Sequence, residues 1–160
     1  MTYTLHVNGN LYDLDVPAQR SLLQVLREEL GLMGPREACG VGMCGSCTVL
    51  VDGNAVSSCL LLVPQVIGKQ IITVEGLAIN GKLHPVQQAF LDHHAFQCSF
   101  CTPGFIMATI ALLEQNPQPS DGEIREHLAG NLCRCGSYPE ILSAVRSLVE
   151  NKPRTHDHPV

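Results

Sequence analysis

The stretch ACGVGMCGSC, residues 38–47, determines how the N-terminal half of this chain is built. It brings three cysteines into one loop, and a fourth follows further along the chain. These residues, the N-terminal set, are Cys39, Cys44, Cys47 and Cys59. The order C-x4-C-x2-C followed by a more distant cysteine is the spacing of plant-type [2Fe–2S] clusters. The stretch therefore predicts a loop that holds an iron–sulfur cluster.

Glycines lie between these cysteines, at Gly40, Gly42 and Gly45. Glycine adopts backbone φ angles that are closed to other residues. We therefore expect this loop to turn its backbone N–H groups toward the bridging sulfides, where hydrogen bonds help to set the reduction potential. A tetrahedral zinc site is the alternative. Zinc sites usually pair their cysteines in two C-x2–4-C knuckles, a pattern that this loop lacks.

The segments around the loop favour a small sheet crossed by one helix. YTLHV and LYDLDV flank Asn8-Gly9, a dipeptide suited to a tight hairpin turn. LLQVLREEL, residues 22–30, predicts a helix on which Leu22, Val25, Leu26 and Leu30 share one face. Asp52-Gly53 marks a second hairpin, and IITVEGL is typical of a closing strand.

Helix-start signals replace these strand signals from about residue 84 onward. Pro85 and Pro103 each head an apolar segment, and Pro139 heads a last helix that continues to about residue 151. Ser120 and Glu123 form a capping box before another helical segment. The pattern predicts four helices in a small bundle.

The domain boundary is expected near Asn80-Gly81. This predicts a cluster-binding domain over residues 1–79, a helical domain over 80–152 and a flexible tail over 153–160, where apolar periodicity is absent.

The helical half has four cysteines of its own. Two occur in QCSFC before Pro103, and two occur in GNLCRC before Pro139; these residues, the helical set, are Cys98, Cys101, Cys133 and Cys135. On spacing alone a zinc site is an open alternative. Two cysteine turns that face each other before helices can also present four sulfurs to a buried cluster. We therefore predict a second cluster in this half.

Other polar residues offer weaker signals. His84 and the pair His93-His94 are interpreted as ordinary helix-face residues, and the histidines at 156 and 158 as solvated. Arg36 and Arg134 are either surface residues or positive charges near a cluster. The sequence shows no nucleophile–base arrangement and no glycine-rich phosphate loop, so we expect no catalytic residue on this chain.

Composition narrows the function classes. The chain has 160 residues, of which 45% are hydrophobic, so a real core can form. Its 10 Lys and Arg against 15 Asp and Glu give a net charge of −5, which disfavours a nucleic-acid partner. No apolar stretch is long enough to insert into a membrane, and the start lacks a signal-peptide pattern, which indicates a cytoplasmic protein. Since that compartment keeps thiols reduced, metal binding explains the eight cysteines better than disulfides do.

Three motifs in this order resemble the iron–sulfur subunit of the molybdenum hydroxylase (xanthine oxidase) family. They are ACGVGMCGSCTVLVDG with its later Cys59, QCSFCTPGFIM and GNLCRCGSYPEI, and the resemblance runs from about residue 3 to residue 150. It implies an α+β fold, with a ferredoxin-like β-grasp domain followed by a four-helix bundle domain. It also implies an electron-transfer subunit of an oxidoreductase.

The resemblance further implies cofactors and partners. The helical set would hold the inner [2Fe–2S] cluster, nearest the molybdenum, with Gln97 and Cys135 against the pterin, while the N-terminal set would hold the outer cluster. The molybdenum–molybdopterin, as the cytosine dinucleotide, would lie on a large partner subunit. Electrons would leave through FAD on a medium subunit or through a cytochrome c subunit.

Some residues depart from the family's usual pattern. Val41 stands where many relatives have Glu, Ser99 where they have Gly, and Gly136-Ser137 where they have Thr-Gly. None of these changes removes a cluster ligand, but they leave the choice between aldehyde and N-heteroaromatic substrates open. A free-standing two-cluster ferredoxin and a zinc-stabilised interaction module are the alternative functions.

Overall fold

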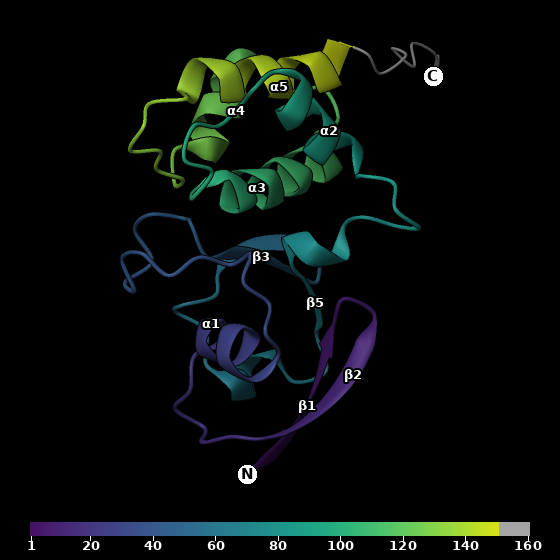
Figure 1. Ribbon diagram of the computed structural model, residues 1–160, viewed down its shortest axis with the longest axis vertical. Coiled ribbons are helices and arrows are strands. Elements are labelled where there is room, and N and C mark those ends of the chain that lie inside the picture. Colours follow the sequence, from purple (N-terminus) through teal and green to yellow (C-terminus); the bar gives the residue numbers. More distant parts are fainter. Residues whose placement is uncertain (151–160) are drawn as a thin grey trace, which may run out of the picture.

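A computed structural model describes residues 1–150 and shows a sheet-containing part and a helical part stacked along the long axis (Figure 1). This confirms the predicted α+β class. The tail over 153–160, its two histidines and the end of the last predicted helix lie outside the described residues.

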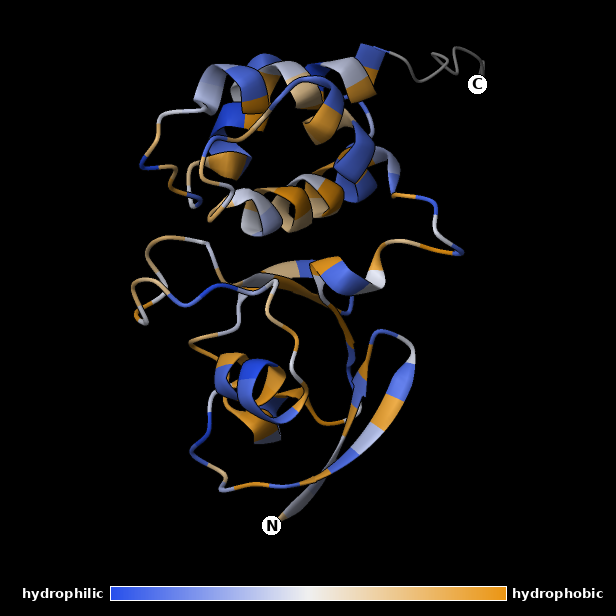
Figure 2. Ribbon diagram, viewed as in Figure 1, coloured by the Kyte–Doolittle hydropathy of each residue, from blue (hydrophilic) through white to orange (hydrophobic). Residues whose placement is uncertain are grey.

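Five strands form one mixed sheet in the order β2-β1-β5-β3-β4. Their bounds are β1 (Thr2–Val7), β2 (Asn10–Asp15), β3 (Thr48–Val51), β4 (Asn54–Ser57) and β5 (Gln70–Ile72). β1 runs parallel to β5, whereas the remaining pairs are antiparallel. The first hairpin turns at Asn8 and Gly9, which both have positive φ angles of 50° and 80°. β2 carries both hydrophobic and hydrophilic residues (Figure 2); Tyr12 and Leu14 are half-buried on one face, whereas Leu11 lies exposed on the other.

The predicted helix over residues 22–30 differs from the expectation in its winding. It begins as α1 (Leu22–Gln24) and continues as the π-helical turn η1 (Val25–Glu29), in which Leu30 N–H donates to the Val25 carbonyl at 3.2 Å. Its apolar face is nevertheless buried in the sheet core, because Leu22, Val25 and Leu26 are fully covered. The apolar spacing sets which face is buried, but not whether the last turn is α or π.

Strand β3 belongs to both cores of the molecule. Val49 and Val51 pack with Val25 and other residues against the crossing helix, whereas Leu50 packs with the helical part. Because side chains of a strand alternate between its two faces, a strand buried on both faces reads as a continuous apolar run. This is why TVLV contains no charged residue.

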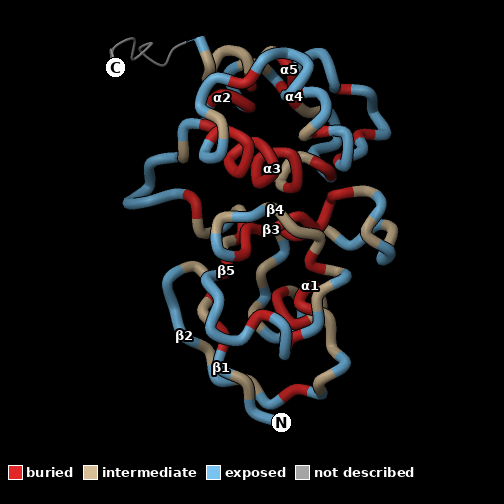
Figure 3. Tube along the Cα trace, turned by 180° about the vertical axis from the view of Figure 1, so that it is seen from behind, coloured by how far each residue is buried: buried red, intermediate tan, exposed pale blue. Residues whose placement is uncertain are grey.

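Helix α3 is the central element of the helical part. It lies on β3 in Figure 1, and in Figure 3 nearly its whole length is buried, from Gly104 to Leu113. A helix covered on all sides is apolar all round, which matches GFIMATIALL. α3 spans Thr102–Gln115, and three further helices complete the helical part: α2 (Pro85–Asp92), α4 (Asp121–Leu128) and α5 (Tyr138–Glu150). Two short 3-10 turns, η2 (Val63–Val66) and η3 (Val74–Gly76), complete the fold.

The predicted helix starts agree with these bounds to within one residue. Pro85 is the first residue of α2, Pro103 the second of α3, and α5 begins one residue before Pro139. Ser120 accepts the Glu123 N–H, and the Glu123 side chain accepts the Ser120 N–H, so the predicted capping box is confirmed. None of the helices within residues 1–150 is long and apolar enough to cross a membrane.

Candidate metal centres in two cysteine sets

The N-terminal set lies in the loop between η1 and β3, with Cys59 just after β4. Gly40, Gly42 and Gly45 all have positive φ angles, of 67°, 75° and 67°. These left-handed positions fold the loop back on itself, as the sequence predicts.

The thiols of the N-terminal set meet in two pairs. The Cys44 thiol acts on the pKa of Cys39, and the Cys47 thiol acts on the pKa of Cys59. The backbone N–H of Val41, helped by the Cys44 thiol and further loop N–H groups, lowers the pKa of Cys39 to about 6. Burial, together with its bond to Cys47, raises the pKa of Cys59 to about 11. The loop N–H groups thus favour a negatively charged sulfur at its exposed end.

The helical set is assembled from two segments, one before α3 and one between α4 and α5. Its thiols also form pairs, Cys98 with Cys135 and Cys101 with Cys133. The first pair is exposed and the second is buried. One pair of sulfurs therefore faces outward from the surface of the protein.

Backbone N–H groups and burial act in opposite directions in this set. The Phe100 N–H lowers the pKa of Cys98, whereas burial raises the pKa of Cys101 to about 12. Burial also acts to raise the pKa of Cys133. Hydrogen bonds from Ser137 N–H, the Cys101 thiol and neighbouring backbone outweigh it, so this pKa is lowered overall. The pKa is thus lowered for Cys98 and Cys133 of the helical set, as it is for Cys39 of the N-terminal set.

Paired thiols fit a two-iron cluster better than a single metal ion. Within residues 1–150 no group of three or more His, Cys, Asp or Glu side chains is placed to hold one metal ion, whereas zinc needs four donors around one centre. In a [2Fe–2S] cluster each iron takes two cysteine sulfurs, so two neighbouring pairs are the required donor set. Each set supplies two such pairs, Cys39–Cys44 with Cys47–Cys59 and Cys98–Cys135 with Cys101–Cys133. The residues present therefore fit two such clusters.

A hydrogen-bonded seam joins the two sets directly. Leu132 N–H, next to Cys133, donates to the Cys44 carbonyl at 2.9 Å. The buried Asn131 amide donates to the Gly45 carbonyl, also at 2.9 Å. Only glycine fits at the contact, because a Cβ atom on Gly45 would lie 2.5 Å from the Asn131 amide nitrogen. The two cysteine loops are therefore joined by one main-chain hydrogen bond and by one from the Asn131 side chain.

Two residues that support the helical set were missed by sequence reasoning. The Tyr138 hydroxyl accepts a hydrogen bond from Cys133 N–H at 2.9 Å, and its ring packs edge-on against Phe105 with centroids 6.2 Å apart. Asn131 forms the seam just described. Both belong to the segment GNLCRCGSY, so their place beside the cysteines was the available signal.

The structure also places the remaining candidates. Gln97, predicted beside the pterin, donates to the Cys135 carbonyl at 3.2 Å and is exposed with it. His84 caps α2 by accepting the Val86 N–H, and His93 is bonded to Ser143, which are ordinary helix contacts.

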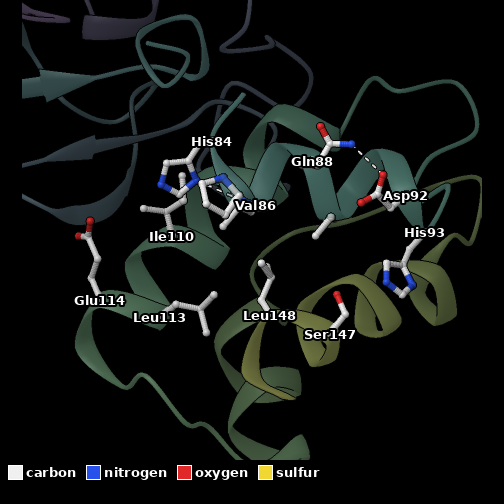
Figure 4. Close-up of a pocket in the computed structure, with 12 residues that line it drawn as sticks. His84, Val86, Gln88, Asp92, His93, Ile110, Leu113, Glu114, Ser147 and Leu148 are labelled. Atoms are coloured by element: carbon white, nitrogen blue, oxygen red, sulfur yellow. Dashed lines mark hydrogen bonds between the residues drawn. The ribbon is translucent and has the colours of Figure 1, made fainter. Parts of the chain in front are cut away.

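A cavity of about 610 Å³ lies away from both sets, between α2, α3 and α5 (Figure 4). Ile110, Leu113 and Leu148 form its apolar wall, with Asp92 and Glu114 at its edge. None of the cysteines lines it, so it does not belong to the metal centres.

Two family models match this chain. A 2Fe-2S iron-sulfur cluster binding domain matches residues 5–70, and a [2Fe-2S] binding domain matches residues 73–146. Each matched segment contains one of the two cysteine sets.

Named relatives cover nearly the whole chain. The nicotinate dehydrogenase small FeS subunit of Eubacterium barkeri is 44% identical over 150 residues, covering 94% of this chain and 96% of that protein. The xanthine dehydrogenase iron-sulfur-binding subunit of Escherichia coli O157:H7 is 46% identical over 154 residues, covering 95% and 96%. Among solved structures, quinoline 2-oxidoreductase from Pseudomonas putida 86 matches with a TM-score of 0.89 and 42% identity, covering 94% of each chain.

Proposed function

Because this chain belongs to the iron–sulfur subunits of the molybdenum hydroxylase (xanthine oxidase) family, we propose that it carries electrons from a molybdopterin centre through two [2Fe–2S] clusters to a separate acceptor. It is an electron-transfer subunit of an oxidoreductase complex. The observation that carries the proposed route is the seam, in which Leu132 beside one set is hydrogen-bonded to Cys44 of the other.

The eight cysteines are the ligands in this proposal. The N-terminal set holds the outer cluster, with Gly40, Gly42 and Gly45 supplying loop backbone, and the helical set holds the inner cluster. When bound, each cluster takes up and releases one electron at a time. The two electrons released by substrate oxidation at a partner's metal would then leave one at a time through the clusters. This chain therefore needs no catalytic residue.

The partner on the inner side is a large subunit that carries molybdopterin, as the cytosine dinucleotide. The exposed pair Cys98 and Cys135, with Gln97 bonded to it, supports this placement because these groups face outward. Phe100 and Leu132 nearby are 42% and 52% exposed. Exposed apolar side chains around a charged site are typical of a surface that a partner covers.

The acceptor docks at the outer side. Val41, Met43 and Leu60, on or beside the loop of the N-terminal set, are 61%, 72% and 59% exposed. A medium subunit carrying FAD or a cytochrome c subunit fits this place. The assembly is cytoplasmic, where its eight thiols stay reduced until metal is bound.

The substrate of the complex is an N-heteroaromatic ring in this proposal, with an aldehyde as the second candidate. The nicotinate and quinoline relatives are the basis, because each is similar to 94% of this chain. In this proposal residues 1–79 form a β-grasp domain and residues 80–152 a four-helix bundle domain. Substrate-contacting residues are then on the large subunit.

The test is metal analysis and EPR of the dithionite-reduced protein, purified with the subunits that accompany it. We expect about four iron atoms per chain and two distinct [2Fe–2S] signals, with molybdenum in the same fraction. A protein that contains both iron and zinc would contradict the proposal of a second cluster. A full iron content in a stable monomer without molybdenum would instead identify a free-standing ferredoxin.

A further inference from the structure

Arg36 contacts both cysteine loops. Its backbone N–H donates to the carbonyl of Ser46, between Cys44 and Cys47, at 3.0 Å. Its guanidinium carbon lies 5.9 Å from the centroid of the Phe100 ring, between Cys98 and Cys101. A cation is thus fixed where the two cysteine sets approach each other.

The charge of Arg36 has no carboxylate partner. Within residues 1–150 the ion pairs of the arginines involve Arg20 and Arg146, and none involves Arg36. The Arg36 Nε is buried without a hydrogen-bond partner. A partly buried cation whose Nε has no partner costs free energy unless negative charge is present nearby. Thiolates bound to iron in the two loops would supply that charge.

We propose that Arg36 is an electrostatic positioning residue that raises the reduction potential of both clusters and that Phe100 holds its charge in place. This inference rests on the two clusters of the proposed function. With the clusters bound, each electron received would add one negative charge to a centre that four cysteine thiolates of this chain would hold. A fixed positive charge favours that reduced form, because net charge and nearby charges set cluster potentials.

The charge also affects the second electron. With one electron on each cluster, the two sets repel each other across the seam. The Arg36 guanidinium lies against Phe100 of one loop while its backbone is bonded to Ser46 of the other, so its charge would reduce that repulsion. Arg36 therefore allows both clusters to be reduced together, as a two-electron donor requires.

The experiment is an EPR-monitored redox titration of the intact complex carrying Arg36→Met or Arg36→Gln, compared with Arg36→Lys. We expect each neutral variant to lower the ratio of reduced to oxidised cluster about tenfold at a fixed potential, a shift of about 59 mV in both midpoints. Arg36→Lys should keep both midpoint potentials within about 20 mV of the unmodified complex, which corresponds to a roughly twofold change in the ratio of reduced to oxidised cluster.

The matched control is Arg146→Met, which removes a charge from α5 in its ion pair with Asp121. Unchanged midpoints in both neutral variants would overturn the proposal, as would an equal shift in Arg36→Lys or in Arg146→Met. Iron content and the two EPR signals of the unmodified complex report on the clusters themselves. Their absence would count against the proposed function rather than against the role of Arg36 alone.

Discussion

The N-terminal set draws three of its cysteines from one loop of nine residues, Cys39 to Cys47, whereas the helical set joins two segments, with Cys101 and Cys133 32 positions apart. The first is shaped locally, by glycines with left-handed backbone. The second is shaped by packing, because α3, α4 and α5 bring its two segments together. The same donors in the same paired arrangement thus have two different structural origins.

The seam shows that the local loop is not independent of the packed one. Gly45 belongs to the loop, yet its close contacts are to Gly130 and Asn131 of the helical part. Substitutions that separate backbone strain from contact across the seam therefore distinguish the two origins.

Gly45→Ala should have the largest effect. The new Cβ would lie 2.5 Å from the Asn131 amide and 2.6 Å from the Gly130 carbonyl, in a left-handed conformation. We expect a loss of about 4 kcal/mol in the free energy of unfolding, from strain and overpacking together. Denaturant unfolding and iron content measure the loss.

Gly40→Ala is the control, with the same φ of 67° and open space around it, and should cost only about 1–2 kcal/mol. Equal losses in the two variants would show that the seam does not constrain the loop.

Asn131→Asp should have the next largest effect. In the unmodified protein the Gly45 carbonyl accepts a 2.9 Å hydrogen bond from the Asn131 amide. The substitution keeps the shape of the side chain but replaces this donor with an acceptor. A buried pair of acceptors should cost about 2 kcal/mol. Thermal unfolding measures the loss, and EPR of the doubly reduced protein measures magnetic coupling between the clusters. Asn54→Asp, at an exposed amide bonded only to the Asp52 carbonyl, should leave both unchanged.

Tyr138→Phe should affect the helical set and leave the N-terminal set unchanged. It removes the hydroxyl that accepts from Cys133 N–H but keeps the ring against Phe105. We expect a loss of about 1 kcal/mol, with a changed EPR signal for the inner cluster and an unaltered one for the outer cluster. A change in the outer signal alone would contradict the assignment of Tyr138 to the helical set.

Asp121→Asn should have the smallest effect, and a pH-dependent one. The hydrogen bond from Arg146, at 2.8 Å, lowers the pKa of Asp121 below its ordinary value of 3.8. A lowered pKa means that the carboxylate stabilises the folded state above pH 3.8, and that this contribution is lost as pH falls through the folded-state pKa. The melting temperature of the variant should therefore lie slightly below that of the unmodified protein at neutral pH and converge with it in acid. A difference that persists at low pH would point to lost packing between α4 and α5 instead.

Sequence patterns predicted what depends on neighbours along the chain. The Asn8-Gly9 turn, the Ser120 cap and the spacing of the cysteines are all local, and each was readable from a few residues. The π turn over Val25–Glu29 was not, since α and π winding bury the same side chains. The roles of Asn131 and Tyr138 could not be predicted from the sequence either. They depend on which loop lies next to these residues in the folded protein.

The sharing of β3 bears on how the molecule comes apart. Leu50 belongs to the helical core, while Val49 and Val51, on either side of it, belong to the sheet core. Fraying of that strand exposes both interiors at once, so the two halves should melt in a single cooperative step. Its backbone amides should be among the slowest to exchange with deuterium. Cutting the chain near residue 80 would therefore separate the helical core from the β3 side chain that packs into it. The two fragments should not fold as independent electron carriers.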